Sequence, residues 1–380
     1  MPVRILFVIS ELSLGGAERQ LLVLARALMR AGYEVSVAVF RRGSAMEADP
    51  AAAGIQLQAL AGRGPLEKMV SLRRLVARWR PDVVHGYLTV GNIAALTARL
   101  VVPRPLIAWG VRASDMQMEV YPLKWRLAAQ IERHLAPLAD LLITNSKAGL
   151  KTLLDRGVTA GKALVIENGI DLSRFTASGG LWAERRATMR RLWAIDETQT
   201  VIGHVARIDP MKDHATFFAG LAHAAGRRAD IHGVAVAVGS DDAREALRRR
   251  AIAEGLGKRL TIVGPVSDIA DAYPGFDVFC SSSAWGEGFS NVIAEALASG
   301  VPTVATDVGN AAELVGDAGQ CVPPSDPAAL GAALLAVTEA RKIMATRARM
   351  RVADFGPDRL AARTVAALAA RHASFRGTGK

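Results

Sequence analysis

The sequence has few cysteines and no long apolar run, and both absences exclude classes of protein. Only Cys280 and Cys321 occur among its 380 residues, with no spacing motif, so we expect neither a disulfide framework nor a cysteine metal site. No window of about 18 apolar residues is present, which argues against a helix that spans a bilayer. The first ten residues are too short and too strand-like for a signal peptide. We therefore expect a cytoplasmic protein.

Negative charge is scarce in the first half of the chain. The net charge is +11, and residues 1–180 hold 23 Lys and Arg against 14 Asp and Glu. Basic and apolar residues mix at helical spacing in 67–81 and 121–137, with Trp79 and Trp125 among them. Such a surface suits anionic lipid headgroups, and we expect a peripheral position on the inner face of the cell membrane. Nucleic acid is the competing polyanion, which we do not expect as a partner, and an ordinary solvated basic face is the alternative.

Apolar strand-like runs alternate with helical patterns along most of the chain. The first series of runs is 3–9, 34–40, 82–87, 105–110, 141–145 and 163–169. The second series is 200–207, 232–239, 259–264, 277–283 and 302–307. Strands separated by helices predict a parallel sheet with helices on both faces.

The two series predict an α/β protein with two Rossmann-like, doubly wound domains that face each other. We place an N-terminal domain at 1–175, a polar linker at 176–198 and a C-terminal domain at 199–352. A C-terminal helix at 353–380 is expected to pack back on the N-terminal domain. Ligands of such sheets bind at the carboxyl ends of the strands, so we expect a site between the domains.

The stretch WGEGFSNVIAEALASG (285–300) combines two carboxylates with the start of a helix. Gly300 and Pro302 are typical of a helix end, which places Glu287 in the loop before the helix and Glu295 inside it. Glu295 can accept hydrogen bonds from ribose hydroxyls. Glu287 can hold sugar hydroxyls or balance charge near a reacting carbon. The spacing alone is a weak signal, and two surface glutamates are the alternative.

The expected helix start is itself a candidate phosphate site. Backbone N–H groups near Phe289, Ser290 and Asn291 have no partner within the helix, and the helix dipole places partial positive charge there. Gly288 lets a ligand approach the backbone closely. The sequence thus predicts a site for phosphate oxygens at this position.

Two basic residues lie at the end of the strand expected at 200–207 and just after it. Arg207 and Lys212 lie in VARIDPMKDH (205–214), at the carboxyl end of that strand. Departure of a nucleoside diphosphate leaves negative charge on its β-phosphate, which two fixed cations can stabilise as it develops. Without this position, an Arg and a Lys five residues apart would be ordinary surface residues.

The block at 285–300 resembles the donor-binding motif of the retaining GT-B glycosyltransferases of family 4, and the resemblance covers most of the chain. Further stretches similar to that family are GGAER (15–19), TNSKAG (144–149), ENGIDLSRF (167–175), VARIDPMKDH (205–214) and VGPVSDIADAY (263–273). The resemblance places Gly16 near the donor pyrophosphate or the acceptor. It places Val266 in a loop that holds the nucleobase through backbone groups.

The resemblance implies transfer of a sugar from a nucleotide sugar to an acceptor hydroxyl, with retention at the anomeric carbon. We expect a UDP-sugar donor, because the 285–300 block looks most like members that use UDP-sugars. The acceptor would be a glycan or lipid-linked precursor. With Arg207, Lys212 and the helix start holding the diphosphate, and no Asp-x-Asp pair in the chain, we expect no metal and no cofactor.

One motif of the family is missing. Many members carry a histidine after the strand expected here at 105–110, and this chain has none there. Arg112 and Asp115 are the nearest polar candidates, and we place Arg112 near the acceptor or the diphosphate. His85 ends another strand and is our acceptor-side candidate, although a lone histidine is more often a structural hydrogen-bonding residue.

Three other functions fit part of the pattern. A sugar-nucleotide 2-epimerase would use the same architecture and diphosphate clamp. A dinucleotide oxidoreductase would need Gly-x-Gly-x-x-Gly after the first strand, and LSLGGAERQ lacks it. A non-catalytic binding protein is expected to have lost some of the charged residues named above, and all are present.

Overall fold

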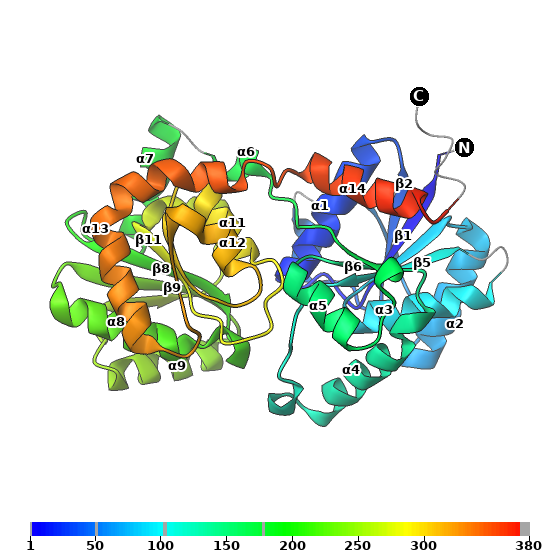
Figure 1. Cartoon of the computed structure of the whole chain (residues 1–380), viewed down its shortest axis with the longest axis horizontal. Helices are drawn as coiled ribbons and strands as arrows, with labels where there is room; N and C mark the ends of the chain where they lie inside the picture. Colours follow the sequence, from blue (N-terminus) through cyan, green and yellow to red (C-terminus); the bar gives the residue numbers. More distant parts are fainter. Residues whose placement is uncertain (1, 50–51, 102–104, 177–178, 373–380) are drawn as a thin grey trace. The chain divides into compact units, whose positions relative to one another are not determined.

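The computed structural model describes residues 2–49, 52–101, 105–176 and 179–372. The chain forms two compact units (Figure 1): unit 1 comprises Met1–Gly169 and Phe355–Lys380, and unit 2 comprises Ile170–Asp354. Each unit is built around one parallel sheet, with the strand orders β3-β2-β1-β4-β5-β6-β7 and β10-β9-β8-β11-β12-β13.

Unit 1 has seven strands with helices between them. The strands are β1 (Arg4–Ile9), β2 (Glu34–Val39), β3 (Gln56–Ala59), β4 (Val83–Tyr87), β5 (Leu106–Val111), β6 (Leu141–Thr144) and β7 (Ala163–Val165). The α-helices are α1 (Gly16–Arg30), α2 (Pro65–Trp79), α3 (Leu88–Leu96), α4 (Leu123–Leu135), α5 (Lys147–Asp155) and α14 (Pro357–Ala369). The strand order reverses between β1 and β4, which are parallel neighbours in the sheet but are not consecutive in sequence.

Alternation along β1 divides the core of unit 1 into two layers. Ile5 and Phe7 belong to the layer under α1 and α14, whereas Leu6 and Val8 belong to the layer under α2 and α3. Successive side chains of a strand point to opposite faces, so a strand that is apolar at every position must be covered on both. Each fully buried side chain of this kind stabilises the unit by about 1.5–3 kcal/mol.

Unit 2 repeats the arrangement with six strands. They are β8 (Thr200–Arg207), β9 (Ile231–Val238), β10 (Leu260–Val263), β11 (Val278–Ser281), β12 (Thr303–Thr306) and β13 (Gly319–Val322). The α-helices are α6 (Leu172–Phe175), α7 (Gly180–Leu192), α8 (His214–Arg227), α9 (Asp241–Ala253), α10 (Ile269–Ala272), α11 (Asn291–Ala298), α12 (Ala311–Val315) and α13 (Pro327–Val352). Short 3-10 turns follow several elements, including η7 (Pro210–Lys212) and η8 (Tyr273–Gly275).

The two faces of this second sheet carry different helices. Ile202 and Cys280 lie in the core layer formed with α8, α9 and α13. Phe279, the neighbour of Cys280, points to the other face, where its ring meets that of Tyr273. Helix α11 packs on β11 and β12 and contacts α6. The strand order reverses between β8 and β11, and the candidate functional residues of unit 2 lie at this reversal.

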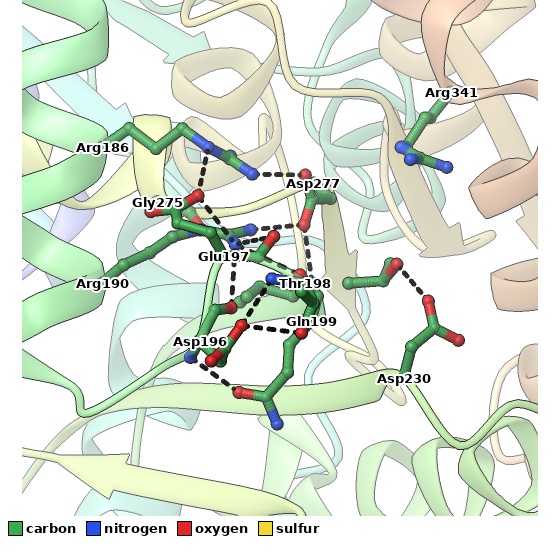
Figure 2. A network of polar contacts seen from close by, with 12 residues as sticks. Arg186, Arg190, Asp196, Glu197, Thr198, Gln199, Asp230, Gly275, Asp277 and Arg341 are labelled. Carbon is green, nitrogen blue, oxygen red and sulfur yellow. Dashed lines mark hydrogen bonds and ion pairs between the residues drawn. The ribbon is translucent and has the colours of Figure 1, made fainter.

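The range 176–198, expected as a linker, is instead part of unit 2 wherever the structure describes it. Helix α7 occupies most of it and is held by the polar network shown in Figure 2. Arg186 and Arg190 donate to the two oxygens of Asp277 at 2.9 and 2.6 Å, and Arg190 has only 1% of its side chain exposed. The high charge of this segment suggested a solvated linker, but its arginines are paired with a carboxylate that lies next to β11.

Two other expectations need correction. Strands β3 and β13 were not expected, because QLQA and GQCV lack a continuous apolar run; both are edge strands with a single neighbour. Strand β7 is shorter than 163–169. The expected 353–380 helix corresponds to α14, which packs against α1 within unit 1, and residues 373–380 lie outside the described part of the chain.

Candidate functional site

The candidate residues of unit 2 gather at the carboxyl end of its sheet. Arg207 ends β8 and Lys212 follows it, Val266 follows β10, and the stretch 285–295 follows β11. Because β8 leads into α8 on one face and β11 into α11 on the other, the loops after these neighbouring strands diverge. Such a reversal of strand order is where doubly wound sheets bind ligands.

A buried ion pair joins the two diverging loops. Lys212 Nζ donates to Glu287 Oε1, and the two side chains are 17% and 12% exposed. Ser283 Oγ donates to the same carboxylate oxygen at 2.7 Å. Ser282 Oγ donates to the backbone carbonyl of Lys212 at 2.9 Å, so backbone and side chain of this lysine are both fixed from the β11 loop.

The surroundings of Glu287 keep it charged. Burial by itself would raise the pKa of Glu287, but the positive charge and hydrogen bond of Lys212, with the hydroxyl of Ser283, hold that pKa below its ordinary value. Arg207 adds a weaker effect in the same direction. The site therefore contains an ionised carboxylate that is fixed beside the Lys212 side chain.

The start of α11 lies directly after this pair. Ser290 is its N-cap; its N–H donates to Asn310 Oδ1 at 3.3 Å, and its buried hydroxyl has no hydrogen-bond partner among the described residues. Gly309 has φ +69°, and a Cβ there would lie 2.5 Å from the carbonyl oxygens of Glu287 and Gly288. The loop before α11 is thus closely packed from behind. First-turn amides and an unpartnered hydroxyl are groups that a phosphate can accept hydrogen bonds from.

The residues at and after the start of α11 differ in their surroundings. Phe289 is 3% exposed and belongs to the core, and Asn291 is the first residue of α11. Glu295 is 3% exposed, and its Oε2 accepts a hydrogen bond from the Tyr273 hydroxyl at 2.8 Å. The two carboxylates therefore differ in environment: Glu287 has a cationic partner, and Glu295 has a phenol.

Arg207 lies at the edge of this group. Its side chain is 52% exposed, and its nearest carboxylate is that of Asp209, at 3.8 Å. The backbone is firmly placed, because His214 Nε2 donates to the Arg207 carbonyl at 3.0 Å. Val266 lies half-buried in the loop after β10. The structure thus brings Lys212 and Glu287 into contact and leaves the Arg207 side chain half exposed beside them.

Arg112 belongs to unit 1 and follows β5. Its guanidinium lies 4.5 Å from the ring centroid of Tyr87, donates to the Tyr87 hydroxyl, and donates to Asn168 Oδ1 at 3.2 Å. Gly16 is the exposed first residue of α1. Unit 1 therefore presents a cation held by an aromatic ring after β5 and a glycine helix start after β1.

His85 lies in the core of unit 1, where it exposes no atom to a ligand. It is fully buried in β4, with its ring 5.2 Å from that of Phe7 and 4.9 Å from that of Tyr87. Burial, aided by the charge of Arg112, lowers the pKa of His85 to about 3. The prediction that His85 lies on the acceptor side was wrong. Its position in β4 directs its ring into the core layer under α1, and not toward the carboxyl end of the sheet.

Sequence reasoning missed three side chains that shape these sites. Ser283 orients Glu287, Tyr87 supports Arg112, and Tyr273 donates to Glu295. Ser283 and Tyr87 stand at the ends of the expected strands 277–283 and 82–87, which is the one signal that pointed to them. Tyr273 lay in the quoted stretch 263–273, but nothing in the sequence connects it with a glutamate 22 positions away.

Among the described residues, no group of three or more His, Cys, Asp or Glu side chains could hold a metal ion. No helix in the described ranges combines the length and apolar character needed to cross a bilayer.

The chain consists of two doubly wound α/β units. In unit 2, the start of a helix that suits an anion and a Lys–Glu ion pair lie where the strand order reverses. These features are typical of the α/β proteins that bind nucleotides with two such units. Family models narrow this class: residues 14–174 match Glycosyltransferase Family 4, and residues 199–340 match Glycosyl transferases group 1. The chain belongs to this family of glycosyltransferases.

Individual relatives agree with this assignment. The chain is 31% identical over 249 residues to a GDP-mannose-dependent alpha-mannosyltransferase of Mycobacterium tuberculosis, covering 64% of this chain and 60% of that relative. It is 25% identical over 336 residues to the phosphatidyl-myo-inositol mannosyltransferase of Mycolicibacterium smegmatis, covering 86% and 81%. The crystal structure of HepE from Anabaena in complex with UDP-glucose shares the fold, with a TM-score of 0.83, 22% identity, and 97% and 99% coverage.

Buried neutral histidines should make the protein sensitive to mild acid. Burial lowers the pKa of His204 to about 3, from 6.5 in an exposed residue. Between these values the unfolded chain binds a proton that the folded chain excludes, so the free energy of unfolding falls as pH decreases, by up to about 1.4 kcal/mol per pH unit for each such histidine. Urea unfolding at about pH 7 and about pH 5 measures this dependence.

The variant His204→Phe should have a weaker pH dependence, and His134→Gln, at an exposed position, should behave like the parent protein. An unchanged pH dependence in His204→Phe would contradict the assignment of a buried neutral imidazole.

Proposed function

We propose that the protein transfers a sugar from a nucleotide sugar to an acceptor hydroxyl, with retention of the anomeric configuration, and that unit 2 binds the donor. The observation that carries this proposal is the Lys212–Glu287 pair beside the start of α11. In this arrangement the diphosphate accepts hydrogen bonds from the first amides of α11, from Ser290 and from Lys212. The ribose lies on Glu295, and the nucleobase lies against the backbone near Val266.

The chemistry of the transfer follows from where charge develops. The bond between the anomeric carbon and the β-phosphate oxygen breaks, and the acceptor oxygen forms its bond on the same face of the sugar. The acceptor proton passes to an oxygen of the departing diphosphate. Lys212, Arg207 and the helix start stabilise the charge left on that diphosphate. Glu287 fixes Lys212 and balances positive charge at the anomeric carbon, and no step requires a bound metal.

A uridine nucleotide is our first candidate for the donor. The 285–300 block resembles members that use UDP-sugars, and HepE was crystallised with UDP-glucose. A relative of higher sequence identity is named for GDP-mannose, so the test compares both bases. Thermal-shift measurements with UDP-, GDP- and ADP-sugars identify the donor by the largest rise in melting temperature. Product analysis by NMR then distinguishes transfer with retention from epimerisation of the donor sugar.

We further propose a lipid-linked or glycan acceptor at an anionic membrane surface. None of the residues of α4 is buried, and four of its large apolar side chains are between 46% and 64% exposed: Leu123, Trp125, Leu127 and Ile131. Basic residues alternate with them, and the Lys124 ammonium lies 5.6 Å from the Trp125 ring. An amphipathic basic helix of this kind suits an interface with anionic headgroups. One relative is named for mannosyl transfer to phosphatidyl-myo-inositol, which is a lipid.

Loss of the ammonium at position 212 should mainly slow turnover. Lys212→Ala leaves Glu287 buried without its cation, so the better variant is Lys212→Met combined with Glu287→Gln, which removes both charges. We expect kcat to fall by about 100-fold or more, with a smaller change in the donor KM. Steady-state kinetics with the donor found by thermal shift measures both.

The matched control is Lys258→Ala, which removes an exposed lysine of the same unit. Parent-like kcat in the doubly substituted protein, with its melting temperature preserved, would mean that the pair takes no part in catalysis.

Membrane binding has a separate test. Flotation with phosphatidylglycerol vesicles at low salt should recover the protein with the lipid, and phosphatidylcholine vesicles should not. Trp125→Ser combined with Leu127→Ser should reduce recovery, because it removes apolar contact area from α4. Ile343→Ser, at an exposed apolar position of α13, is the control. Equal recovery with both lipids, or none at low salt, would exclude this surface.

A further inference from the structure

A buried tyrosine contacts the second glutamate of the proposed donor site. Tyr273 has no exposed surface, and its hydroxyl donates to Glu295 Oε2 at 2.8 Å. Hydrogen bonds that involve an ionised group are stronger than neutral ones. Both partners lie inside unit 2, where little water competes for this bond. The phenol therefore helps to hold the Glu295 carboxylate in one orientation.

The Tyr273 ring is itself held by other aromatic rings. Phe175, Phe276 and Phe279 lie with their centroids 5.9, 6.0 and 5.8 Å from it, all in edge-to-face arrangements. Phe276 is stacked in turn on Trp193, at 5.3 Å. A phenol surrounded in this way cannot swing away from Glu295 without disturbing the core.

The backbone that carries Tyr273 is also anchored. Tyr273 directly follows α10, whose N-cap Asp268 accepts hydrogen bonds from its own helix and from Arg174 at 2.9 Å. Arg185 of α7 pairs with Asp271 of α10 at 3.0 Å. Helix α10 is only four residues long, so these two ion pairs to α6 and α7 set its position.

We propose that Tyr273 is a positioning residue for recognition of the donor ribose, acting through Glu295. This proposal rests on the proposed function, in which Glu295 accepts hydrogen bonds from the ribose hydroxyls. A carboxylate that rotates freely makes poorly directed hydrogen bonds to a pair of hydroxyl groups. When the Tyr273 hydroxyl holds one carboxylate oxygen of Glu295, the second oxygen keeps a constant direction toward the ribose. Tyr273 does not touch the nucleotide; it determines how well unit 2 distinguishes a ribose from a sugar without hydroxyls.

The segment that precedes α7 also helps to position Tyr273. Phe175 is the last residue of α6 and lies five positions after Ile170, the first residue of unit 2. Its ring is 4% exposed and presses on the edge of the Tyr273 ring. The chain that enters unit 2 is therefore in contact, through two rings, with the carboxylate assigned to the ribose.

The test compares a ribonucleotide with its dideoxy analogue. Isothermal titration calorimetry gives the Kd of UDP and of 2′,3′-dideoxy-UDP, and of the two GDP forms, for the parent protein and for Tyr273→Phe. This substitution keeps the ring and removes only the hydroxyl. We expect the preference for UDP over dideoxy-UDP, or for the matching guanosine pair, to fall about tenfold, which corresponds to one hydrogen bond to a charged group.

A purely structural role for the hydroxyl predicts a different result. It would weaken UDP and dideoxy-UDP equally and leave their ratio unchanged, which would overturn the proposal. In a Glu295→Ala background, Tyr273→Phe should have no further effect on the ratio, because the group it acts through is gone. Tyr33→Phe, which removes a hydroxyl from unit 1, is the control and should leave every Kd unchanged.

Failure of this inference can be distinguished from failure of the proposed function. If Glu295→Ala leaves the ratio unchanged, the ribose does not lie on Glu295 and the donor site is misassigned. If Glu295→Ala lowers the ratio but Tyr273→Phe does not, the donor site stands and the role of Tyr273 is wrong. Should Tyr273→Phe be too unstable to assay, Phe175→Leu loosens the ring and should lower the ratio by a smaller factor; an unchanged ratio there counts against the proposal.

Discussion

The ion pair between Lys212 and Glu287 is the interaction on which the proposed donor site of unit 2 depends. It joins the loop after β8 to the loop after β11, at the place where neighbouring strands lead to opposite faces of the sheet. Removing one partner of a buried pair costs about 3–5 kcal/mol, because the other charge is left without compensation. The pair therefore holds the two loops in one geometry and, in the proposed reaction, keeps an ammonium where the diphosphate departs.

The two glutamates of the 285–300 stretch have different partners, and we therefore assign them different roles. Glu287 is ionised beside the Lys212 side chain, and this ion pair interacts electrostatically with any charge that develops on a ligand bound there. Glu295 sits inside α11 and receives a hydrogen bond from a phenol held among aromatic rings. A carboxylate fixed by a neutral donor is suited to recognising hydroxyl groups. In the proposed arrangement, the loop before α11 thus supplies a charged group near the diphosphate, and α11 itself supplies an oriented carboxylate for the ribose.

Sequence reasoning predicted the elements whose signal is local and missed the features that only packing determines. Apolar runs such as 200–207 become central strands because a strand covered on both faces must be apolar at every position. Edge strands β3 and β13 have weaker patterns because one side is unpaired. The contact between Lys212 and Glu287 joins residues 75 positions apart, and no local pattern encodes it. His85 was misplaced for a related reason: its position near the end of the strand expected at 82–87 suggested an acceptor-side place, whereas strand alternation directs its ring into the core.

The most direct test of the central claim is a crystal structure of the protein with its nucleoside diphosphate. The account predicts a β-phosphate oxygen within hydrogen-bond distance of Lys212 Nζ and of the first amides of α11, with the ribose hydroxyls on Glu295. A nucleotide bound elsewhere on unit 2, with the Lys212–Glu287 pair and the α11 start making no contact with phosphate, would contradict it.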